Sequence, residues 1–563
     1  MLDTLLLAAI PLLPFAAAAV LALDMAALQR LSERAVRRIA GSAVALSFLL
    51  SAWILAGQAR HPAAILVHFG RWLYSGDYRV DIDLLIDPLS ATMMVLTTGF
   101  GALVSRFSQG YMHRERGFRR FYAVLSLFIA SMLLLVMGGN LVLTFAGWEG
   151  VGLCSYLLIG FYYEREAPAS AGTRAFITNR IGDVGFLAAI FLTFTRLGAI
   201  DYRSMAAGAG ALDGHAATII ALCLLVAVAA KSAQLPLSPW LARAMEGPTP
   251  SSALFYAAVM VNAGVYLVVR ARPLFEAAPG ALAAMAAVGA ATALYGGLVG
   301  AVQTDVKGAL IFSTQAQLGL MFLTIGLGDA TIAVAHMVAH AIFRGFQFLA
   351  APSVLLRQRP GSAPPPPPAQ AWFAPFVVGG IALVLGLAPL ARPGSSLHGF
   401  LAVAAGEPAG RPLLPQLPAS GALGLLLLAA WSASAYGRRA AAGRAAVPAP
   451  DRGRLYAAAL HRLWLEDLHE RIAVRPVLRL GRWLDRLDVQ ALERLIGHLV
   501  AWIAGAVHTV EEHVVARGVG RGIPATGRAL GRTLDRLDGV LDQPLVACAL
   551  IVVCLAAVLQ GAL

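Results

Sequence analysis

Long apolar stretches recur along the chain and are separated by short polar connections. An α-helix needs roughly 17–25 mostly apolar residues to cross a bilayer. The pattern predicts about 14 such helices. They lie at residues 2–23, 39–57, 89–105, 121–137, 139–161, 175–195, 216–236, 251–269, 281–302, 308–327, 330–355, 372–391, 419–436 and 545–562. The predicted fold class is therefore an all-α polytopic membrane protein.

One of these stretches is interrupted near its end. Lys231 is followed by SAQLPLSPW, in which Pro236 and Pro239 cannot support a continuous helix. A helix that is interrupted at membrane depth is tolerated only where it lines a cavity or is buried in protein. The sequence thus predicts a discontinuous helix at Lys231.

Two later segments differ from the spans. Residues 358–371 (QRPGSAPPPPPAQA) form a polyproline linker. Residues 438–543 alternate apolar and charged side chains at helical spacing and are too polar to span. Tryptophans at 464, 483 and 502 favour an amphipathic helix along the membrane surface or against neighbours, rather than a basic linker.

Arginine-rich loops predict the orientation in the membrane. Residues 24–38 and 106–120 are rich in arginine, two spans separate them, and basic loops favour the cytoplasmic side. The acidic 77–87 loop then lies outside. Continuing the alternation places the 438–543 region inside and both termini on the outer side. The location that follows is a bacterial inner membrane, crossed many times.

Composition excludes several classes of function. The chain is 58% hydrophobic and 13% charged, with a mean hydropathy of +0.71, whereas soluble proteins carry about 25% charged residues. The net charge of +13 reflects arginines in loops and does not indicate nucleic acid. No GxGxxG, P-loop or CxxC pattern is present. We therefore expect no metal site and no cofactor in this chain.

Lysine is scarce, and this draws attention to two positions. Of the 44 basic residues only Lys231 and Lys307 are lysines, and both border apolar runs. A buried lysine can lose its proton, whereas arginine effectively cannot. A chance placement with the amine reaching the interface is the alternative. Lys307 follows Asp305 and is expected nearer the interface than Lys231.

A carboxylate lies at about the middle of another predicted span. Glu149 occurs in LVLTFAGWEGVGLCSYLLIGFYY. Ionisable groups in a membrane interior are costly and are functional candidates. A Glu149–Lys231 pair would act as a switch, with both groups charged when together and the lysine releasing its proton when apart; a static ion pair is the alternative. Arg180 and Asp183, three residues apart on one helix, could bias Glu149.

Polar side chains also mark two later helices. His336, His340 and Arg344 follow at four-residue intervals and share a helix face. Two histidines at this spacing could bind metal, but no nearby carboxylate or cysteine completes a site. A histidine proton relay is favoured over metal, with simple packing as the alternative. Tyr256 can donate a hydrogen bond but is a weak proton carrier.

These segments resemble a known family. GWEGVGLCSYLLIGFYY, KSAQLPLSPWLARAMEGPTPSSAL and AVQTDVKGALIFSTQAQLGLMFL are similar to subunit L of respiratory complex I, in the superfamily that includes the multisubunit cation/proton antiporters. The resemblance covers roughly residues 80–355. It implies that a proton pathway includes Glu149, Lys231, Lys307 and the histidines at 336 and 340. It also implies tuning by Asp183.

The resemblance has three departures. Tyr256 stands where the family usually has histidine, and Arg344 where it has a lysine. No counterpart of the family's second broken helix, a stretch like PLTAGFFSKDE, follows residue 355. By the count of spans, about two helices of the second half-channel are missing.

The resemblance and the pattern together predict six regions. These are N-terminal helices with an external loop (1–88), an antiporter-like proton-translocation core (89–357), the polyproline linker (358–371), two further spans (372–437), the cytoplasmic-side amphipathic region (438–543) and a last span (544–563).

Three functions compete at this stage. The first is a proton-translocating subunit of a complex I-like assembly, driven by partner subunits and containing no redox chemistry of its own. The second is a proton-conducting subunit that pairs with a soluble zinc-dependent partner in inorganic-carbon uptake. The third is a non-conducting structural paralogue. Protons are the expected cargo, and sodium remains open because carboxylates and free carbonyls at a helix break can coordinate it.

Overall fold

The computed structural model describes residues 2–28, 30–303, 305–357 and 454–487, with a few positions between 498 and 508. The chain divides into two units, residues 1–476 and 477–563. The helices, the hairpin and the site described below belong to the first unit. Three predicted spans, 372–391, 419–436 and 545–562, lie outside the described residues, as do the polyproline linker and the region after it.

Within the described residues, 11 helices are long and apolar enough to cross a membrane. They coincide with the first 11 predicted spans, which confirms a multi-pass helical membrane protein. They are α1 (Leu2–Leu23, continued by the π-helix η1, Asp24–Leu28), α2 (Glu33–Arg60), α3 (Pro88–Tyr111), α4 (Phe118–Met137), α5 (Leu141–Ile159), α6 (Glu166–Leu197), α8 (Gly214–Lys231), the composite span of α10 (Thr249–Ala253), η4 (Leu254–Ala258) and α11 (Asn262–Arg270), then α13 (Pro279–Val302), α14 (Val306–Gly326) and α15 (Ala330–Arg357).

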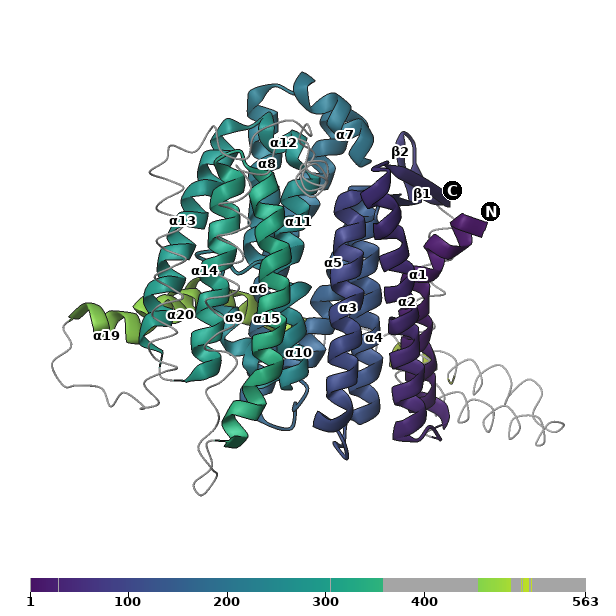
Figure 1. Ribbon diagram of the computed structural model, residues 1–563, viewed down its shortest axis with the longest axis vertical. Helices are drawn as coiled ribbons and strands as arrows, with labels where there is room; N and C mark the ends of the chain where they lie inside the picture. Colours follow the sequence, from purple (N-terminus) through teal and green to yellow (C-terminus); the bar gives the residue numbers. More distant parts are fainter. Residues whose placement is uncertain are drawn as a thin grey trace. The chain divides into compact units, whose positions relative to one another are not determined.

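The helices form a bundle (Figure 1), in which some helices are far more buried than others. All of the most apolar part of the composite span Thr249–Arg270 is buried, compared with only 28% of the most apolar part of α2. Helices α4 and α5 pack against each other, α6 packs on α8, and α13 pairs with α14. The composite span therefore lies at the centre of the bundle, and much of the apolar surface of α2 is left uncovered by this chain.

Two helix pairs approach each other closely because glycine, which has no side chain, stands at the point of contact. A Cβ atom at Gly147 of α5 would lie 2.4 Å from the backbone nitrogen of Leu135 in α4. One at Gly182 of α6 would lie 2.5 Å from the Cβ of Ala230 in α8. Small residues of this kind let membrane helices pack at short range. They bring α5, α6 and α8 close enough for their polar side chains to meet.

Residues 65–86 are the part of the described structure that departs from the predicted all-α fold. They form an antiparallel hairpin of β1 (Ile65–Ser75) and β2 (Tyr78–Ile86), so most of the predicted 77–87 loop is a strand. Gly76, at φ +58°, and Asp77 make the two-residue turn, the chemistry that hairpin turns favour. Strands of this length are too short to produce the long apolar runs that mark membrane-spanning helices.

The hairpin is fixed to the helix bundle at one end. The backbone N–H of Gly139 donates to the carbonyl of Asp83 (2.8 Å), and Leu84 forms an isolated β-bridge with Gly138. At the same end lie the short helices α7 (Tyr202–Gly208), which continues into the 3-10 turn η2 (Ala209–Ala211), and α12 (Arg272–Glu276) (Figure 1). The strand β2 is thereby connected directly to the start of α5.

A buried ion pair stabilises this end. The guanidinium of Arg270, at the end of α11, forms two hydrogen bonds with the carboxylate of Asp87, which caps α3; the Nη2–Oδ1 distance is 2.9 Å. Burial raises the pKa of Asp87, but the charge and hydrogen bonds of Arg270 and the bonds to Ser90 outweigh it, so the pKa lies below its ordinary value. The aspartate therefore stays ionised.

The described part of the predicted surface region is helical. It comprises α19 (Arg454–Leu460), the 3-10 turn η5 (Arg462–Trp464), α20 (Leu465–His469) and the π-helix η6 (Glu470–Val474), and it continues into α21 (Arg475–Leu487), which passes from the first unit into the second. Left-handed backbone at residues 462–464 bends it between α19 and α20. Exposed apolar side chains, such as Leu468 and Ile472, alternate with charged ones.

Polar contacts dock this region on the bundle. Glu470 accepts a 2.8 Å hydrogen bond from Nε of Arg174 in α6, and His469 lies 3.2 Å from the hydroxyl of Thr178 on the same helix. Glu466 pairs with Arg243 of the short helix α9 (Pro239–Arg243) at 3.1 Å. We refer to residues 454–474 as the lateral segment.

We expect Gly147→Leu to destabilise the bundle. The added side chain meets the backbone of α4, and overpacking of this kind costs about 1–3 kcal/mol. Thermal unfolding of the purified chain in detergent measures the effect as a lower midpoint. Gly110→Leu is the matched control, because Gly110 is an exposed helical position where an added Cβ would meet no atom within 4 Å. Equal midpoints for both variants would contradict the close-packing argument.

Docking of the lateral segment should weaken as pH falls. The hydrogen bond from Arg174 lowers the pKa of Glu470, and burial lowers the pKa of His469 below its ordinary 6.5. The docked state therefore binds fewer protons at both residues. The contribution of His469 to the free energy of docking is therefore present above pH 6.5 and is lost below it. The contribution of Glu470 is lost only in more acidic solution.

Hydrogen exchange of residues 465–474, corrected for its intrinsic pH dependence, measures this change. Protection should fall between pH 8 and pH 5.5. In Glu470→Gln it should be low already at pH 8, whereas Glu276→Gln, which alters an exposed intrahelical pair, should behave as wild type. Protection that is constant across this range would show that His469 does not govern docking, and wild-type protection in Glu470→Gln at pH 8 would show the same for Glu470.

Candidate functional site

The break after α8 places Lys231 at the last helical position. Residues 232–238 leave the helix, and α9 begins at Pro239, because neither Pro236 nor Pro239 can supply a helical N–H. The Leu235–Pro236 peptide bond is cis. This confirms the discontinuous helix predicted from the sequence.

Side chains from neighbouring helices satisfy the broken backbone. The hydroxyl of Ser232 donates to the carbonyl of Val261 (2.6 Å), and the N–H of Leu235 donates to the hydroxyl of Thr292 in α13 (3.0 Å). The amide of Gln315 in α14 lies 3.5 Å from the carbonyl of Ala233. Residues 232–234 are buried and the polar groups freed by the break find partners in the protein, as membrane proteins require, whereas Pro236 is exposed.

The amine of Lys231 is completely buried. Its side chain has no exposed surface in this chain. Nζ donates a 3.1 Å hydrogen bond to the carbonyl of Trp148 and lies 4.8 Å from the centre of the Trp148 ring. These contacts partly replace water around an ammonium group. No ion pair to Lys231 is found among the described residues.

Arg180 holds the two carboxylates of the site. Its Nη1 pairs with Oε2 of Glu149, and its Nη2 lies 2.8 Å from Oδ2 of Asp183. The indole N–H of Trp148 donates to the other oxygen of Asp183 (2.7 Å). Trp148 therefore links Lys231 to Asp183, and Arg180 links Asp183 to Glu149. We call these five residues the charge network.

The predicted Glu149–Lys231 pair needs correction. In the structure the direct partner of Glu149 is Arg180, and Lys231 instead contacts Trp148. Arg180 is a stronger competitor, because its planar guanidinium can serve two carboxylates at once. Arg180 was expected to influence Glu149, and it does so by direct contact. Asp183 is connected to Glu149 only through Arg180.

Gly152, which was not among the residues predicted from the sequence, lies between the two cations of the site. A Cβ there would lie 2.9 Å from Nη2 of Arg180 and 3.2 Å from Nζ of Lys231. The two cations therefore flank one backbone position that has no side chain. Trp148 was also missed. The repeated glycines of GWEGVG and the adjacent tryptophan are the signal in the sequence that could have indicated both.

The members of the charge network differ in exposure. Lys231 and Trp148 are fully buried, whereas the side chains of Glu149 and Arg180 are 27% and 32% exposed. Both exposed residues lie within membrane-spanning helices. A charged pair at this depth is costly in contact with lipid. The exposed edge of the network therefore requires cover by protein or water.

The other predicted residues lie on η4, α14 and α15. Lys307, in the first turn of α14, donates to the hydroxyl of Thr249 (3.2 Å) and is not brought next to Lys231 by any described contact. Tyr256 is buried and donates to the carbonyl of Leu241 (2.7 Å). Its hydroxyl proton is thus directed to backbone.

The face shared by His336, His340 and Arg344 is buried and polar. His336 lies 2.5 Å from the side-chain oxygen of Gln317, and Arg344 contacts Ser313, so α14 and α15 meet through polar side chains. His340 is 2% exposed. Gln315, whose amide reaches the helix break, lies on α14 between Ser313 and Gln317, which makes α14 the element between the break and the histidines.

Two family models match the chain. One, described as "NADH:quinone oxidoreductase/Mrp antiporter, TM", matches residues 138–363, which include the charge network and both histidines. The other, described as "NADH-Ubiquinone oxidoreductase (complex I), chain 5 N-terminus", matches residues 72–122.

Individual proteins and structures agree with these models. NADH-quinone oxidoreductase subunit L of Mycobacterium tuberculosis (strain H37Rv) is 45% identical over 321 residues, which are 56% of this chain and 51% of that protein. The Escherichia coli (strain K12) protein of the same name is 46% identical over 288 residues, 51% of this chain and 47% of that protein. The matched parts thus amount to about half of these relatives.

A chain from the structure of the Mrp complex of Dietzia sp. DQ12-45-1b superposes with a TM-score of 0.61 at 25% identity, covering 99% of this chain and 63% of that one. The helical arrangement and the residues of the charge network thus fall in the same matched region. Over residues 72–122 and 138–363 the chain is therefore similar to the membrane subunits that NADH:quinone oxidoreductase and the Mrp antiporters share.

Proposed function

We propose that this chain is a proton-translocating membrane subunit of an assembly like complex I or the Mrp complex. The observation that carries the proposal is the amine of Lys231, which is fully buried at a helix break and belongs to the charge network. A lysine can exist as ammonium or as free amine, and burial makes the neutral form accessible. The relatives named above support the assignment by their names.

The network offers a way to control that amine. While Arg180 is engaged by Glu149 and Asp183, its charge is compensated close to Lys231. Loss of the Glu149 charge, by protonation or movement, removes one negative charge from the network, so that only Asp183 still balances Arg180 beside Lys231. A like charge nearby disfavours the ammonium form, so Lys231 would release a proton. Return of the Glu149 charge would favour its reprotonation.

The proton would then pass along α14 toward α15. The carbonyl of Ala233 and the amide of Gln315 bridge the break to α14, and His336 meets Gln317 on the same helix. Water between these groups would complete the path to His336 and His340, with Lys307 serving the same helix near its start. Tyr256 and Arg344 act as polar supports, because arginine cannot release a proton.

Partner subunits supply the driving force in this proposal. The exposed edge of Glu149 and Arg180 faces outward at membrane depth and fits a neighbouring membrane subunit that covers it. A neighbour that moves a charge near Glu149 would change how strongly that carboxylate holds Arg180. The chain itself needs no cofactor for this role. The membrane would be a bacterial inner membrane, with the arginine-rich loops on the cytoplasmic side.

Proton flux into vesicles tests the proposal. The tagged chain is purified with the partners it retains and is reconstituted with a pH-sensitive dye inside; a potassium gradient with valinomycin provides the voltage. We expect flux in wild type and background flux in Lys231→Ala. Lys231→Arg should also fall to background because its charge is permanent. Glu149→Gln should be severely slowed.

Arg106→Gln is the control, since this arginine is exposed and lies outside the charge network. It should keep wild-type flux, and all variants should elute as one monodisperse species. Equal flux in wild type, Lys231→Ala and Glu149→Gln would eliminate the proposal and leave a non-conducting subunit. Flux that disappears when choline replaces sodium would instead identify sodium as the transported ion.

A further inference from the structure

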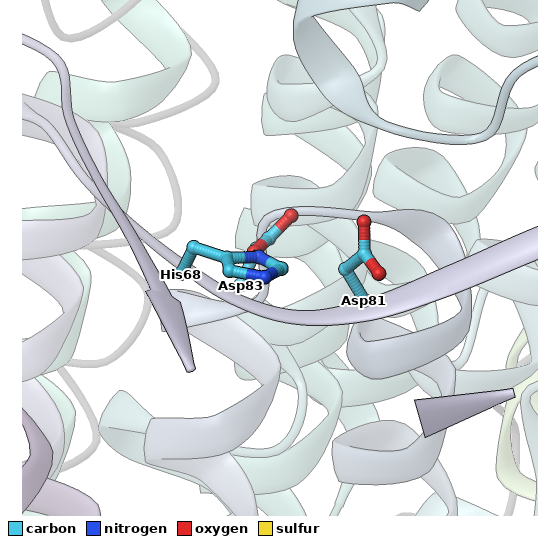
Figure 2. A group of neighbouring side chains, drawn as sticks. All are labelled: His68, Asp81 and Asp83. Carbon is cyan, nitrogen blue, oxygen red and sulfur yellow. The ribbon is translucent and has the colours of Figure 1, made fainter. Parts of the chain in front are cut away.

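Three side chains with metal-ligand chemistry gather on one face of the hairpin. His68, Asp81 and Asp83 each offer one ligand atom, and these atoms lie within 4.8 Å of one another (Figure 2). The strand geometry accounts for this. Asp81 and Asp83 are two residues apart on β2 and point to the same face, and His68 on β1 is directly opposite Asp83.

The contacts within this group are uneven. Nδ1 of His68 lies 2.7 Å from Oδ1 of Asp83, and the Asp83 side chain is only 14% exposed. Among the residues that the structure describes, no hydrogen bond or ion pair engages the carboxylate of Asp81. The site therefore holds one carboxylate with unused acceptor capacity beside a histidine–carboxylate pair.

A cation already near Asp81 is turned away from it. Arg71 is the cross-strand neighbour of Asp81, but its guanidinium carbon lies 6.0 Å from the centre of the Tyr74 ring on its own strand. The strand register shifts between His68 and Arg71, at Gly70, whose φ is +142°. Bulges redirect side chains, and this one leaves the face of Asp81 open.

The backbone under the two carboxylates is fixed. The side-chain amide of Asn140 donates to the carbonyl of Asp81 (2.8 Å), and the N–H of Gly139 donates to the carbonyl of Asp83 (2.8 Å). Both donors belong to the connection that leads into α5. The ligands thus stand on a strand tied to the rigid bundle, and binding would require little ordering of the backbone.

We propose that this face of the hairpin binds a divalent transition-metal ion, with Zn²⁺ as the best match. One imidazole nitrogen of His68 and one oxygen from each aspartate would be the protein ligands, and water or a group from a neighbouring subunit would occupy a fourth position. Mixed nitrogen and oxygen ligands suit Zn²⁺, whereas Mg²⁺ and Ca²⁺ prefer oxygen alone.

The geometry requires only a small closure. Ligand atoms around a tetrahedral Zn²⁺ are about 3.3 Å apart when each bond is about 2.0–2.1 Å. The present limit of 4.8 Å can shrink by rotation of His68, whose side chain is 58% exposed. Binding would replace the hydrogen bond between His68 and Asp83 with two metal bonds. The ion would also compensate the charge of two neighbouring carboxylates.

Metal titration of the intact chain tests this site. The full-length protein, stripped with a chelator in detergent, is titrated with Zn²⁺ against a chromophoric competitor. We expect one ion bound per chain in wild type. His68→Ala and Asp81→Asn should each weaken binding by at least about a hundredfold, since even residues that only support a ligand account for 10–100-fold.

His61→Ala and Asp77→Asn are matched controls, because both residues are exposed and lie near the hairpin outside the cluster. They should bind as wild type. Hydrogen exchange of residues 65–86 gives a second readout: Zn²⁺ should slow exchange in wild type and controls but not in His68→Ala, whose metal-free exchange shows whether the hairpin still forms. Wild type without a tight site, or unchanged binding in His68→Ala, would overturn the proposal and leave a simple hydrogen bond.

Discussion

The structure is organised around charges that must be satisfied away from water. Arg180 engages Glu149 and Asp183, and Trp148 connects Asp183 to the amine of Lys231. Removing one member of such a group would leave the opposite charge buried without a partner, which is far more costly than the group's net contribution to stability. Helices α5, α6 and α8 are therefore held in one arrangement by electrostatics as well as by packing.

Small residues make this arrangement sterically possible. Gly147 allows α5 to approach α4, Gly182 allows α6 to approach α8, and Gly152 leaves room for two cations. Apolar packing in lipid has little hydrophobic driving force between helices, so contact at short range matters more than in water. The same short range limits how far Glu149 and Arg180 can separate without a movement of their helices.

Much of the fold could be predicted from the sequence, because long apolar runs have few alternatives in a membrane. The break after Lys231 was also predictable, since each of the two prolines removes a helical N–H and crowds the preceding turn. The hairpin could not be predicted in the same way, because VDIDLLI alternates over only a few residues and a two-residue period produces no long apolar run.

The partners of the site residues were less accessible to sequence reasoning. Spacing placed Arg180 and Asp183 on one helix, but only packing decides that Glu149 meets Arg180 and not Lys231. The docking of His469 and Glu470 on α6 joins positions about 290 residues apart, and nothing in a single sequence marks such a pair. Likewise His68 and Asp83 meet through strand register, which a missed hairpin cannot supply.

Helix α6 contributes residues both to the docking of the lateral segment and to the charge network. Arg174 and Thr178 receive the lateral segment, and Arg180 and Asp183 belong to the charge network. Nine residues of helix rise by about 13 Å, a length over which a packed helix moves as a stiff rod. A displacement of Glu470 and a change in the ionisation of Glu149 therefore both act on the same rigid stretch of α6.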